Sequence, residues 1–155
     1  MQSSLKPFFA PSGVAILGAS ASPNKLSFGI LRNLTLYGFQ GQIAPVNPGA
    51  TEILGLPCYP DISSVPDPVE LAVVSLPAQV IPGILDSCGR RGIKAVVIIS
   101  GGFKEVGHEG ALLEQKILAI AKNYNMRLIG PNCVGTLDIY TGLNTTFIQG
   151  VPAKG

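Results

Sequence analysis

The sequence contains few charged residues. Lysine and arginine number 11 and aspartate and glutamate 9 among 155 residues, which is a charged share of 13%, about half of the usual share in globular domains. The net charge of +2 is too small for a strong electrostatic attraction to nucleic acid or to an anionic membrane surface. We therefore expect neither nucleic acid nor a membrane among the partners of this chain.

A long uninterrupted hydrophobic run is also missing, although hydrophobic residues make up 46% of the chain. A membrane-spanning helix needs about 20 consecutive apolar residues, and the uncharged stretch 71–85 is interrupted by Pro77, Gln79 and Pro82. Prolines also break the stretch 7–20, which argues against a secretory signal. We expect a cytoplasmic protein.

Histidine and cysteine are scarce. His108 is the only histidine, and Cys58, Cys88 and Cys133 form no C-x-x-C pair. This spacing indicates neither a zinc site nor a disulfide framework, so reduced thiols are the plain interpretation. His108 precedes an expected helix, where a lone histidine is normally on the surface, and no Ser-His-Asp set can be built from it. We therefore assign no catalytic residue and no metal ligand.

Short runs of valine, isoleucine and leucine recur along the chain and alternate with helix-like segments. Strands are expected at 13–18, 42–46, 69–76, 94–100 and 127–130, and helices at 30–37, 80–90 and 109–124. Near-continuous apolar strands are typical of a sheet buried on both faces, and their alternation with helices predicts βαβ units. The predicted fold class is α/β, a Rossmann-like, doubly wound and mainly parallel sheet with helices on both faces.

The length predicts one domain over residues 1–155. The proline-rich segment 52–68 is interpreted as a surface connection with at most a short helix, and the tail 135–155 as a connection to a following domain, which makes the chain a fragment of a longer protein. Helical spacing predicts which side chains face the core. They are Val80, Ile84, Leu85 and Cys88 in the second helix and Leu112, Leu113, Ile117, Ile120 and Ala121 in the third.

The first strand leads into a candidate ligand-binding loop, since ligands of open α/β sheets bind beyond the carboxyl ends of the strands. Gly18 permits a tight turn, Ser20 and Ser22 offer hydroxyl groups, and Lys25 adds a cation. The helix that follows would attract phosphate through its free N–H groups and its dipole. The loop therefore predicts a ligand that carries phosphate.

Two features of the sequence argue against a dinucleotide such as NAD. The next glycine after Gly18 is Gly29, so no G-x-G-x-x-G motif is present, and there is no G-K-[ST] of a Walker A loop. The acid that holds an NAD ribose should end the second strand, where the chain has Asn47-Pro48. A phosphate-bearing nucleotide of another kind remains the expected ligand.

Short motifs along residues 8–150 carry a family resemblance. In chain order they are Gly18-Ala19-Ser20, Asn33-Leu34, Tyr37-Gly38-Phe39, Val46-Asn47-Pro48, Gly102-Phe103-Lys104-Glu105, Gly130-Pro131-Asn132-Cys133-Val134-Gly135 and Leu143-Asn144-Thr145-Thr146-Phe147. Together they resemble the N-terminal CoA-binding domain of the nucleoside-diphosphate-forming acyl-CoA synthetases. This is the ADP-forming acetate–CoA ligase group, related to the α subunit of succinyl-CoA synthetase.

The resemblance implies a reaction in which acyl-CoA, ADP and phosphate interconvert with a free acid, CoA and ATP, by way of an acyl phosphate and a phosphorylated histidine. In the family that histidine lies in the next domain, and His108 does not match it. The nucleotide-binding ATP-grasp module is likewise outside this chain. The implied partners are CoA and the remaining ligase domains or subunit, and the isolated domain is expected to be inactive.

The resemblance also implies a set of CoA-binding residues. The loop from Gly18 and Ala19 through Ser20 to Ser22 would hold the CoA phosphates, beside Lys25. Further along CoA, the residues carried over are Asn47, Pro48, Pro77 and Ala78 at the nucleotide and pantetheine, Ser100 and Gly101 along the arm, and Asn132 and Cys133 at the thiol end. A nucleophilic Cys133 would need a basic partner, and the sequence shows none, so a packing role is favoured for its thiol.

Two other functions stay open at this point. A regulatory CoA-sensing domain of a protein acetyltransferase has a similar front part. An NAD(P)-binding domain of a dehydrogenase is disfavoured by Asn47 and by the missing second glycine. The residues that follow Gly155 in a longer protein would separate a ligase from an acetyltransferase.

Overall fold

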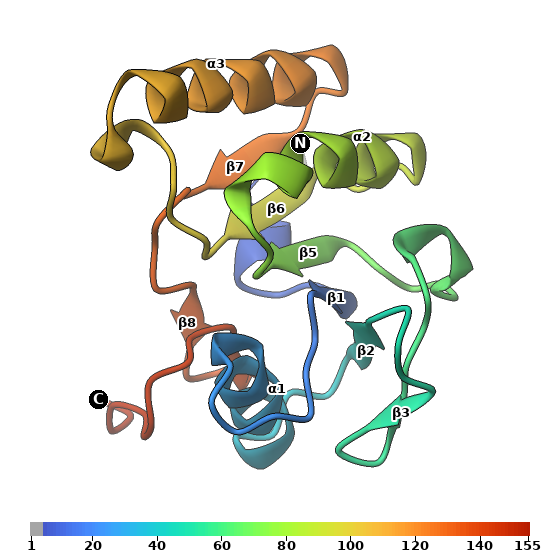
Figure 1. The fold of residues 1–155 in the computed structure, drawn as a ribbon. Coiled ribbons are helices and arrows are strands. Elements are labelled where there is room, and N and C mark those ends of the chain that lie inside the picture. The colour runs from blue at the N-terminus through green and yellow to red at the C-terminus, as the bar shows by residue number, and fades with distance from the viewer. Residues whose placement is uncertain (1–4) are drawn as a thin grey trace.

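A five-stranded sheet forms the centre of the computed structural model, which describes residues 5–155 (Figure 1). The strands stand in the order β2 (Gln42–Val46), β1 (Gly13–Leu17), β5 (Leu71–Val74), β6 (Ala95–Ile98) and β7 (Arg127–Ile129). Every neighbouring pair is parallel. The predicted Rossmann-like parallel sheet is therefore confirmed, while residues 1–4 of the expected domain lie outside the described residues.

Helices cover both faces of the sheet (Figure 1). One face packs against α1 (Leu26–Leu36), and the other against α2 (Ile81–Arg90) and α3 (His108–Asn123). Alternate residues of each strand point to opposite faces, so Val14 and Ile16 of β1 join the α1 side of the core, whereas Ala15 and Leu17 join the other side. This two-sided burial is the reason why the strands appear in the sequence as continuous apolar runs.

Shorter elements connect these layers. They are η1 (Lys6–Phe8), the antiparallel pair β3 (Glu52–Ile53) and β4 (Leu56–Pro57), η2 (Ile62–Ser64), η3 (Ala78–Val80), η4 (Lys104–Val106), and the antiparallel pair β8 (Leu137–Asp138) and β9 (Leu143–Asn144). None of the helices within residues 5–155 has the length and apolar character needed to cross a membrane.

The segment 52–68 differs from the surface connection that the sequence predicts. It contains the β3–β4 hairpin as well as the short helix η2, and the side chains of Ile53, Ile62 and Val65 are buried in the core. Because prolines interrupt this segment, its three isolated apolar residues form no periodic pattern in the sequence. The helix α1 also begins earlier than expected, at Leu26 rather than at residue 30, because Ser27 and Gly29 weaken the apolar pattern of its first turn.

Two of the side chains predicted to face the core are exposed. Val80 is 48% exposed and Leu112 is 51% exposed, whereas Leu85 and Ile117 on the same two segments are fully buried. Val80 belongs to η3, before α2 begins, and lines a pocket instead of the core. Leu112 lies on the outer side of α3, which buries only a narrow stripe of its surface.

Candidate functional site

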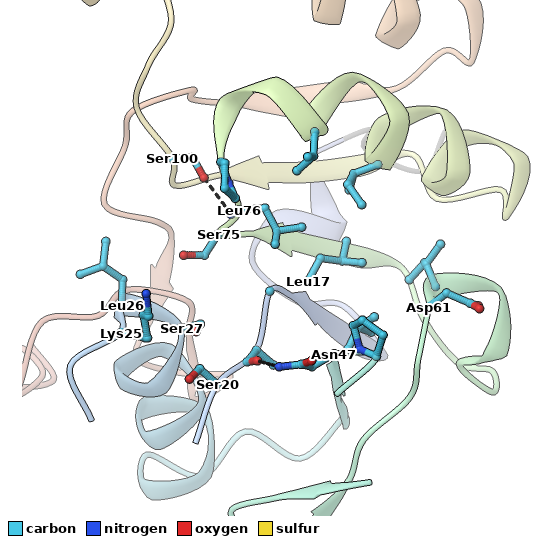
Figure 2. Close-up of a pocket in the computed structure, with 18 of the residues that line it drawn as sticks. Leu17, Ser20, Lys25, Leu26, Ser27, Asn47, Asp61, Ser75, Leu76 and Ser100 are labelled. Atoms are coloured by element: carbon cyan, nitrogen blue, oxygen red, sulfur yellow. Dashed lines mark hydrogen bonds between the residues drawn. The ribbon is translucent and has the colours of Figure 1, made fainter. Parts of the chain in front are cut away.

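A pocket of about 810 Å³ opens at the carboxyl edge of the sheet (Figure 2). Its walls include residues 18–20 after β1, Asn47 and Pro48 after β2, residues 75–77 after β5, and Ser100 after β6. The chain continues from β1 to β2 on one side and later places β5 on the other side of β1. Such a reversal of strand order leaves a crevice between the loops, which is where ligands of open α/β sheets bind.

The loop after β1 approaches the end of β5 very closely at Gly18. This residue has φ +86°, and a Cβ atom placed on it would lie 2.2 Å from the backbone oxygen of Ser75. Only glycine meets both conditions without displacement of the backbone. The backbone N–H groups of Gly18 and Ala19 both donate to the oxygen of Val46, at 3.2 Å each. The loop is therefore held between two strands, with its outer side open to the pocket.

The N-terminus of α1 forms one wall of the pocket. Lys25, Leu26 and Ser27 line it (Figure 2), no side chain caps the helix there, and its first turn contains no acidic residue. Uncapped N–H groups at a helix N-terminus carry partial positive charge. Together with the exposed ammonium group of Lys25, they make this wall electropositive.

Ser20 lies in the loop after β1 and also lines the pocket. Its hydroxyl oxygen accepts a hydrogen bond of 3.0 Å from the backbone N–H of Ser22. The Ser20 hydroxyl can still donate to a ligand, because only its acceptor side is used in this contact.

Asn47 joins the loops after β1 and β2. Its side-chain amide donates to the backbone oxygen of Ala19 at 2.8 Å, and its Oδ1 accepts from the N–H of Gly49 at 2.7 Å. The position directly after β2, which carries an acid in NAD-binding sheets, thus holds a neutral side chain with both ends in use.

The opposite wall of the pocket is mainly apolar. It is made by side chains of β1, β2, η2, η3 and α2 and of the loop after β5, namely Leu17, Val46, Ile62, Leu76, Val80 and Ile84. A wall of this kind suits a ring or an alkyl chain of a ligand. The rim beside it contains Asp61, whose carboxylate accepts from the hydroxyl groups of Ser63 and Ser64 and from the N–H of Ser64. These bonds, that of the Ser63 hydroxyl first, lower the pKa of Asp61.

Of the thirteen residues that the sequence analysis places at the site, eight line the pocket. They are Gly18, Ala19, Ser20, Lys25, Asn47, Pro48, Pro77 and Ser100. The hydroxyl of Ser100 accepts from the N–H of Leu76 at 3.0 Å. This bond links the ends of β5 and β6 and holds the pocket wall there in place.

The other five residues do not line the pocket. Ser22 is exposed and supports Ser20, while Ala78 is buried in the core on the α2 side of the sheet. Gly101 and Asn132 are exposed at the ends of β6 and β7, where the N–H of Asn132 donates to the oxygen of Ser100 at 2.9 Å. Cys133 is half-buried and also lies outside the pocket lining.

The thiol of Cys133 is turned toward the sheet. It donates to the backbone oxygen of Ile98 at 3.3 Å, and burial raises its pKa above the ordinary value. Such a thiol is a weak nucleophile. A packing role therefore fits the contacts of Cys133.

Several residues that line the pocket were not predicted from the sequence. Leu26 and Ser27 directly follow the candidate loop, and recognition of the true start of α1 would have identified them. Val80 and Ile84 were assigned to the core because they are apolar at helical spacing. Asp61 and Ile62 come from the segment interpreted as a surface connection, and no local signal connects them with the pocket.

The one histidine of the chain lies outside the pocket lining, and residues 5–155 contain no cluster of potential metal ligands. His108 is exposed at the first position of α3 and does not line the pocket. Residues 5–155 contain no group of three or more His, Cys, Asp or Glu side chains that could hold a metal ion. The chemical features of the pocket are thus hydroxyl groups, N–H groups, one lysine, the Asp61 carboxylate at the rim and an apolar wall.

Comparison with known proteins gives consistent results. A family described as "CoA binding domain" matches residues 12–138. Acetate–CoA ligase [ADP-forming] II of Archaeoglobus fulgidus is 45% identical over 152 residues, which are 97% of this chain and 23% of that protein. The α subunit of acetate–CoA ligase [ADP-forming] I of Pyrococcus furiosus is 43% identical over 148 residues, which are 93% of this chain and 32% of that subunit. The chain therefore spans less than a third of the length of these curated relatives.

Solved structures agree with the sequence relatives. The dinucleotide-forming acetyl-coenzyme A synthetase 1 of Ca. Korarchaeum cryptofilum, in complex with phosphate and ADP, has a TM-score of 0.88 and 47% identity. The match covers 92% of this chain and 30% of that one. A protein of Pyrococcus horikoshii, PH0766, has a TM-score of 0.90 and 41% identity, over 94% of this chain and 33% of the other.

Proposed function

Because this chain belongs to the CoA-binding domain family and is homologous to the ADP-forming acetate–CoA ligases, we propose that its pocket between β1 and β5 binds coenzyme A. The observation that carries the proposal is the division of the pocket into two kinds of wall. One wall has uncapped helix N–H groups and Lys25, and the other is apolar. CoA combines phosphates with a base and a long pantetheine arm, so it needs both.

The electropositive wall is the proposed site of the CoA phosphates. Gly18 lets the loop pack against the end of β5 while it lines the pocket, the hydroxyl of Ser20 is free to donate, and Lys25 supplies the cation. Hydrogen bonds to charged groups are the stronger kind in proteins. Asn47 and Pro48 would border the nucleotide, and Pro77 the start of the pantetheine, with the buried Ala78 behind it.

The ends of β6 and β7 are the proposed path of the arm toward the thiol. Ser100 lines the pocket, and the Ser100–Asn132 backbone bond links it to the next loop along the same edge of the sheet. Gly101 lies between them in this proposal, and Asn132 with Cys133 near the reacting end. The role of Cys133 here is packing, since its thiol hydrogen-bonds to Ile98.

NAD is disfavoured as the ligand because of the side chain after β2. A ribose diol is normally held there by a carboxylate, whereas Asn47 uses its amide and its oxygen to bind Ala19 and Gly49. The position after β2 therefore provides no carboxylate for the two ribose hydroxyls.

As part of a ligase, this domain would bind CoA, and other domains or subunits would carry out the reaction. The proposed overall reaction interconverts acyl-CoA, ADP and phosphate with a free acid, CoA and ATP, by way of a phosphorylated histidine in another domain or subunit. His108 is exposed, and the pocket does not include it. We therefore expect the 155-residue protein to bind CoA and to form no ATP by itself.

Calorimetric titration of the purified protein with CoA, dephospho-CoA, NAD and ATP tests this proposal. We expect saturable binding of CoA that NAD at similar concentration does not displace. Ser20→Ala should weaken CoA binding about ten- to a hundredfold, because a hydrogen bond to a charged group contributes about 1.5–3 kcal/mol. The matched serine control is Ser12→Ala, an exposed residue that precedes β1 and lies outside the pocket lining, and His108→Ala is a second control. Binding of NAD without binding of CoA would contradict the proposal.

A further inference from the structure

Three residues form a stripe along α1 on a side that the pocket does not use. Gly29, Asn33 and Tyr37 follow one another at intervals of four residues, so they share one side of the helix. They face residues 146–150, which follow β9 and which we call the exit segment. Asn33, Tyr37 and residues 143–147 also belong to the motifs that the pocket leaves unexplained.

Asn33 is the centre of this contact. Its side chain is completely buried, and its Nδ2 donates to the backbone oxygens of Thr146 at 2.7 Å and Ile148 at 2.8 Å. The hydroxyl oxygen of Tyr37 accepts from the N–H of Gly150 at 3.0 Å. The stripe therefore holds the exit segment at both of its ends.

Gly29 allows α1 and the exit segment to lie in close contact. A Cβ atom on this residue would lie 3.1–3.3 Å from the backbone oxygen, Cα and Cβ of Phe147. This is tighter than ordinary van der Waals contact, so a larger side chain would push the exit segment away from the helix.

Asn33 and Tyr37 hold the backbone of the exit segment, while its Phe147 side chain packs against the core on the α1 side. The groups held by Asn33 and Tyr37 are two carbonyls and one N–H, and the side chain of Ile148 is 55% exposed. A change of the Ile148 side chain should therefore leave the segment docked, whereas loss of the Asn33 amide should release it.

The same helix connects this contact with the pocket. Lys25, Leu26 and Ser27 at its start line the pocket, and Ile30, Leu31 and Leu34 fix it to the sheet with no exposed surface. The core face thus holds α1 in place independently of the exit segment. Residues 146–150 have a set position relative to the pocket because both are attached to one rigid helix.

We propose that the stripe is a docking surface for the exit segment and that Asn33 is the positioning residue that fixes where the chain leaves the sheet. The inference rests on the proposed function in one respect, since a fixed exit matters most if the parts that follow must meet a ligand in the pocket. The docking itself depends on the contacts of residues 146–150 with α1 and with the core beside it, and not on a ligand.

Residue-resolved amide exchange of the 155-residue protein, with a CoA titration of each variant, tests this role. Asn33→Leu should speed amide exchange about tenfold or more at Thr146 and Gly150, whose N–H groups bond to Asn144 and Tyr37, because the bonds that anchor the neighbouring carbonyls and resist local opening are lost. Its CoA affinity should stay within about twofold of the wild type, since the core face still holds α1. Two controls, Thr35→Ala on the same helix and Ile148→Ala in the exit segment, should leave exchange there nearly unchanged. The hydroxyl of Thr35 bonds to carbonyls of α1 itself.

Tyr37→Phe provides a second variant if Asn33→Leu fails to fold. It keeps the ring and removes the acceptor of Gly150, so exchange at Gly150 should rise while the rest of the protein is unchanged. Unaltered exchange at residues 146–150 in a folded variant, or a rise spread evenly over the whole chain, would overturn the positioning role. So would a large loss of CoA affinity in Asn33→Leu. If the wild type binds no CoA, the proposed function fails, and the exchange rates still decide this inference.

Discussion

The side-chain amide of Asn47 donates a hydrogen bond of 2.8 Å to the backbone oxygen of Ala19. The residue directly after β2 thereby holds the loop after β1, and both residues line the pocket (Figure 2). A carboxylate at this position could not donate such a bond. The relationship therefore explains how one neutral side chain both shapes the pocket and removes the acceptor that NAD would require.

Asn47→Asp should lower both stability and CoA affinity. The carboxylate would face the carbonyl of Ala19 without a donor, at a cost of about 1–3 kcal/mol in the free energy of unfolding. Its charge should also repel the CoA phosphates and weaken binding about tenfold or more. Denaturant titration and calorimetry measure the two effects. Asn125→Asp is the control, because this exposed residue precedes β7 at the other edge of the sheet. Equal CoA affinities of Asn47→Asp and the wild type would contradict the expectation.

Gly18 and Gly38 form a matched pair for the close approach at the pocket. Their φ angles are +86° and +83°, but a Cβ atom meets the oxygen of Ser75 at 2.2 Å on Gly18 and nothing within 4 Å on Gly38. Gly38→Ala should cost about 1–2 kcal/mol, the strain of a left-handed residue. Gly18→Ala should cost about 3 kcal/mol or more, since overpacking adds to this strain, and should lose CoA binding. If urea unfolding gives the same loss in free energy of unfolding for both variants, the backbone at the β1–β5 contact shifts at little energetic cost, which would contradict the expectation.

A second pair of glycines tests the packing of α2 against α3. A Cβ atom on Gly89 would lie 2.3 Å from the ring of Tyr124, whose hydroxyl donates to Asp86 at 2.7 Å, whereas Gly83 on the same helix has open space around it. Gly83→Ala should raise stability by about 0.5–1 kcal/mol through helix propensity. Gly89→Ala should lower it by about 1–3 kcal/mol through overpacking. Thermal unfolding midpoints should shift in opposite directions, and a shift in the same direction would contradict this packing.

Glu105 makes stability depend on pH at the loop after β6. Hydrogen bonds from its own backbone N–H, from that of Gly102 and from that of Phe103 lower the pKa of the Glu105 carboxyl. A lowered pKa means that the stabilisation is present above the usual glutamate value and is lost as the pH falls through the lowered one. Glu105→Gln should therefore be less stable than the wild type at neutral pH and should converge with it in acid.

Unfolding midpoints measured between neutral and acidic pH check this dependence. Glu109→Gln removes the same charge in the first turn of α3 and serves as the control, with a smaller effect that comes from the helix dipole. A difference between Glu105→Gln and the wild type that stays constant down to low pH would show that the ionised carboxylate is not what stabilises the loop.

The strands β1, β5 and β6 were predictable because they are buried on both faces and are therefore continuously apolar. The boundary of α1 was harder to predict, because Ser27 and Gly29 interrupt its periodicity. Val80 illustrates another limit. An apolar residue at helical spacing can face either the core or a ligand pocket, and only the three-dimensional arrangement distinguishes the two.

The candidate site was predictable only in part, for a similar reason. The loop after β1 is a local feature, and most of its expected residues line the pocket. Asp61 and Ile62 reach the pocket from a segment with no local signal. The hydrogen-bond partners of Asn33 lie 113 and 115 residues away in the chain. The residues next to Asn33 in the sequence therefore could not predict them.

The most direct measurement of the central claim is a map of amide chemical-shift changes in the 155-residue protein as CoA is added. Our account predicts saturable changes concentrated at residues 18–20, Lys25, Leu26, Ser27, Asn47, Ser75, Leu76 and Ser100, the amides that surround the pocket, and at Gly101 and Asn132 along the proposed path of the arm. Residues along α3 and in the exit segment should be almost unaffected. Saturable changes centred away from the carboxyl edge of the sheet, or no saturable change at all, would contradict the account.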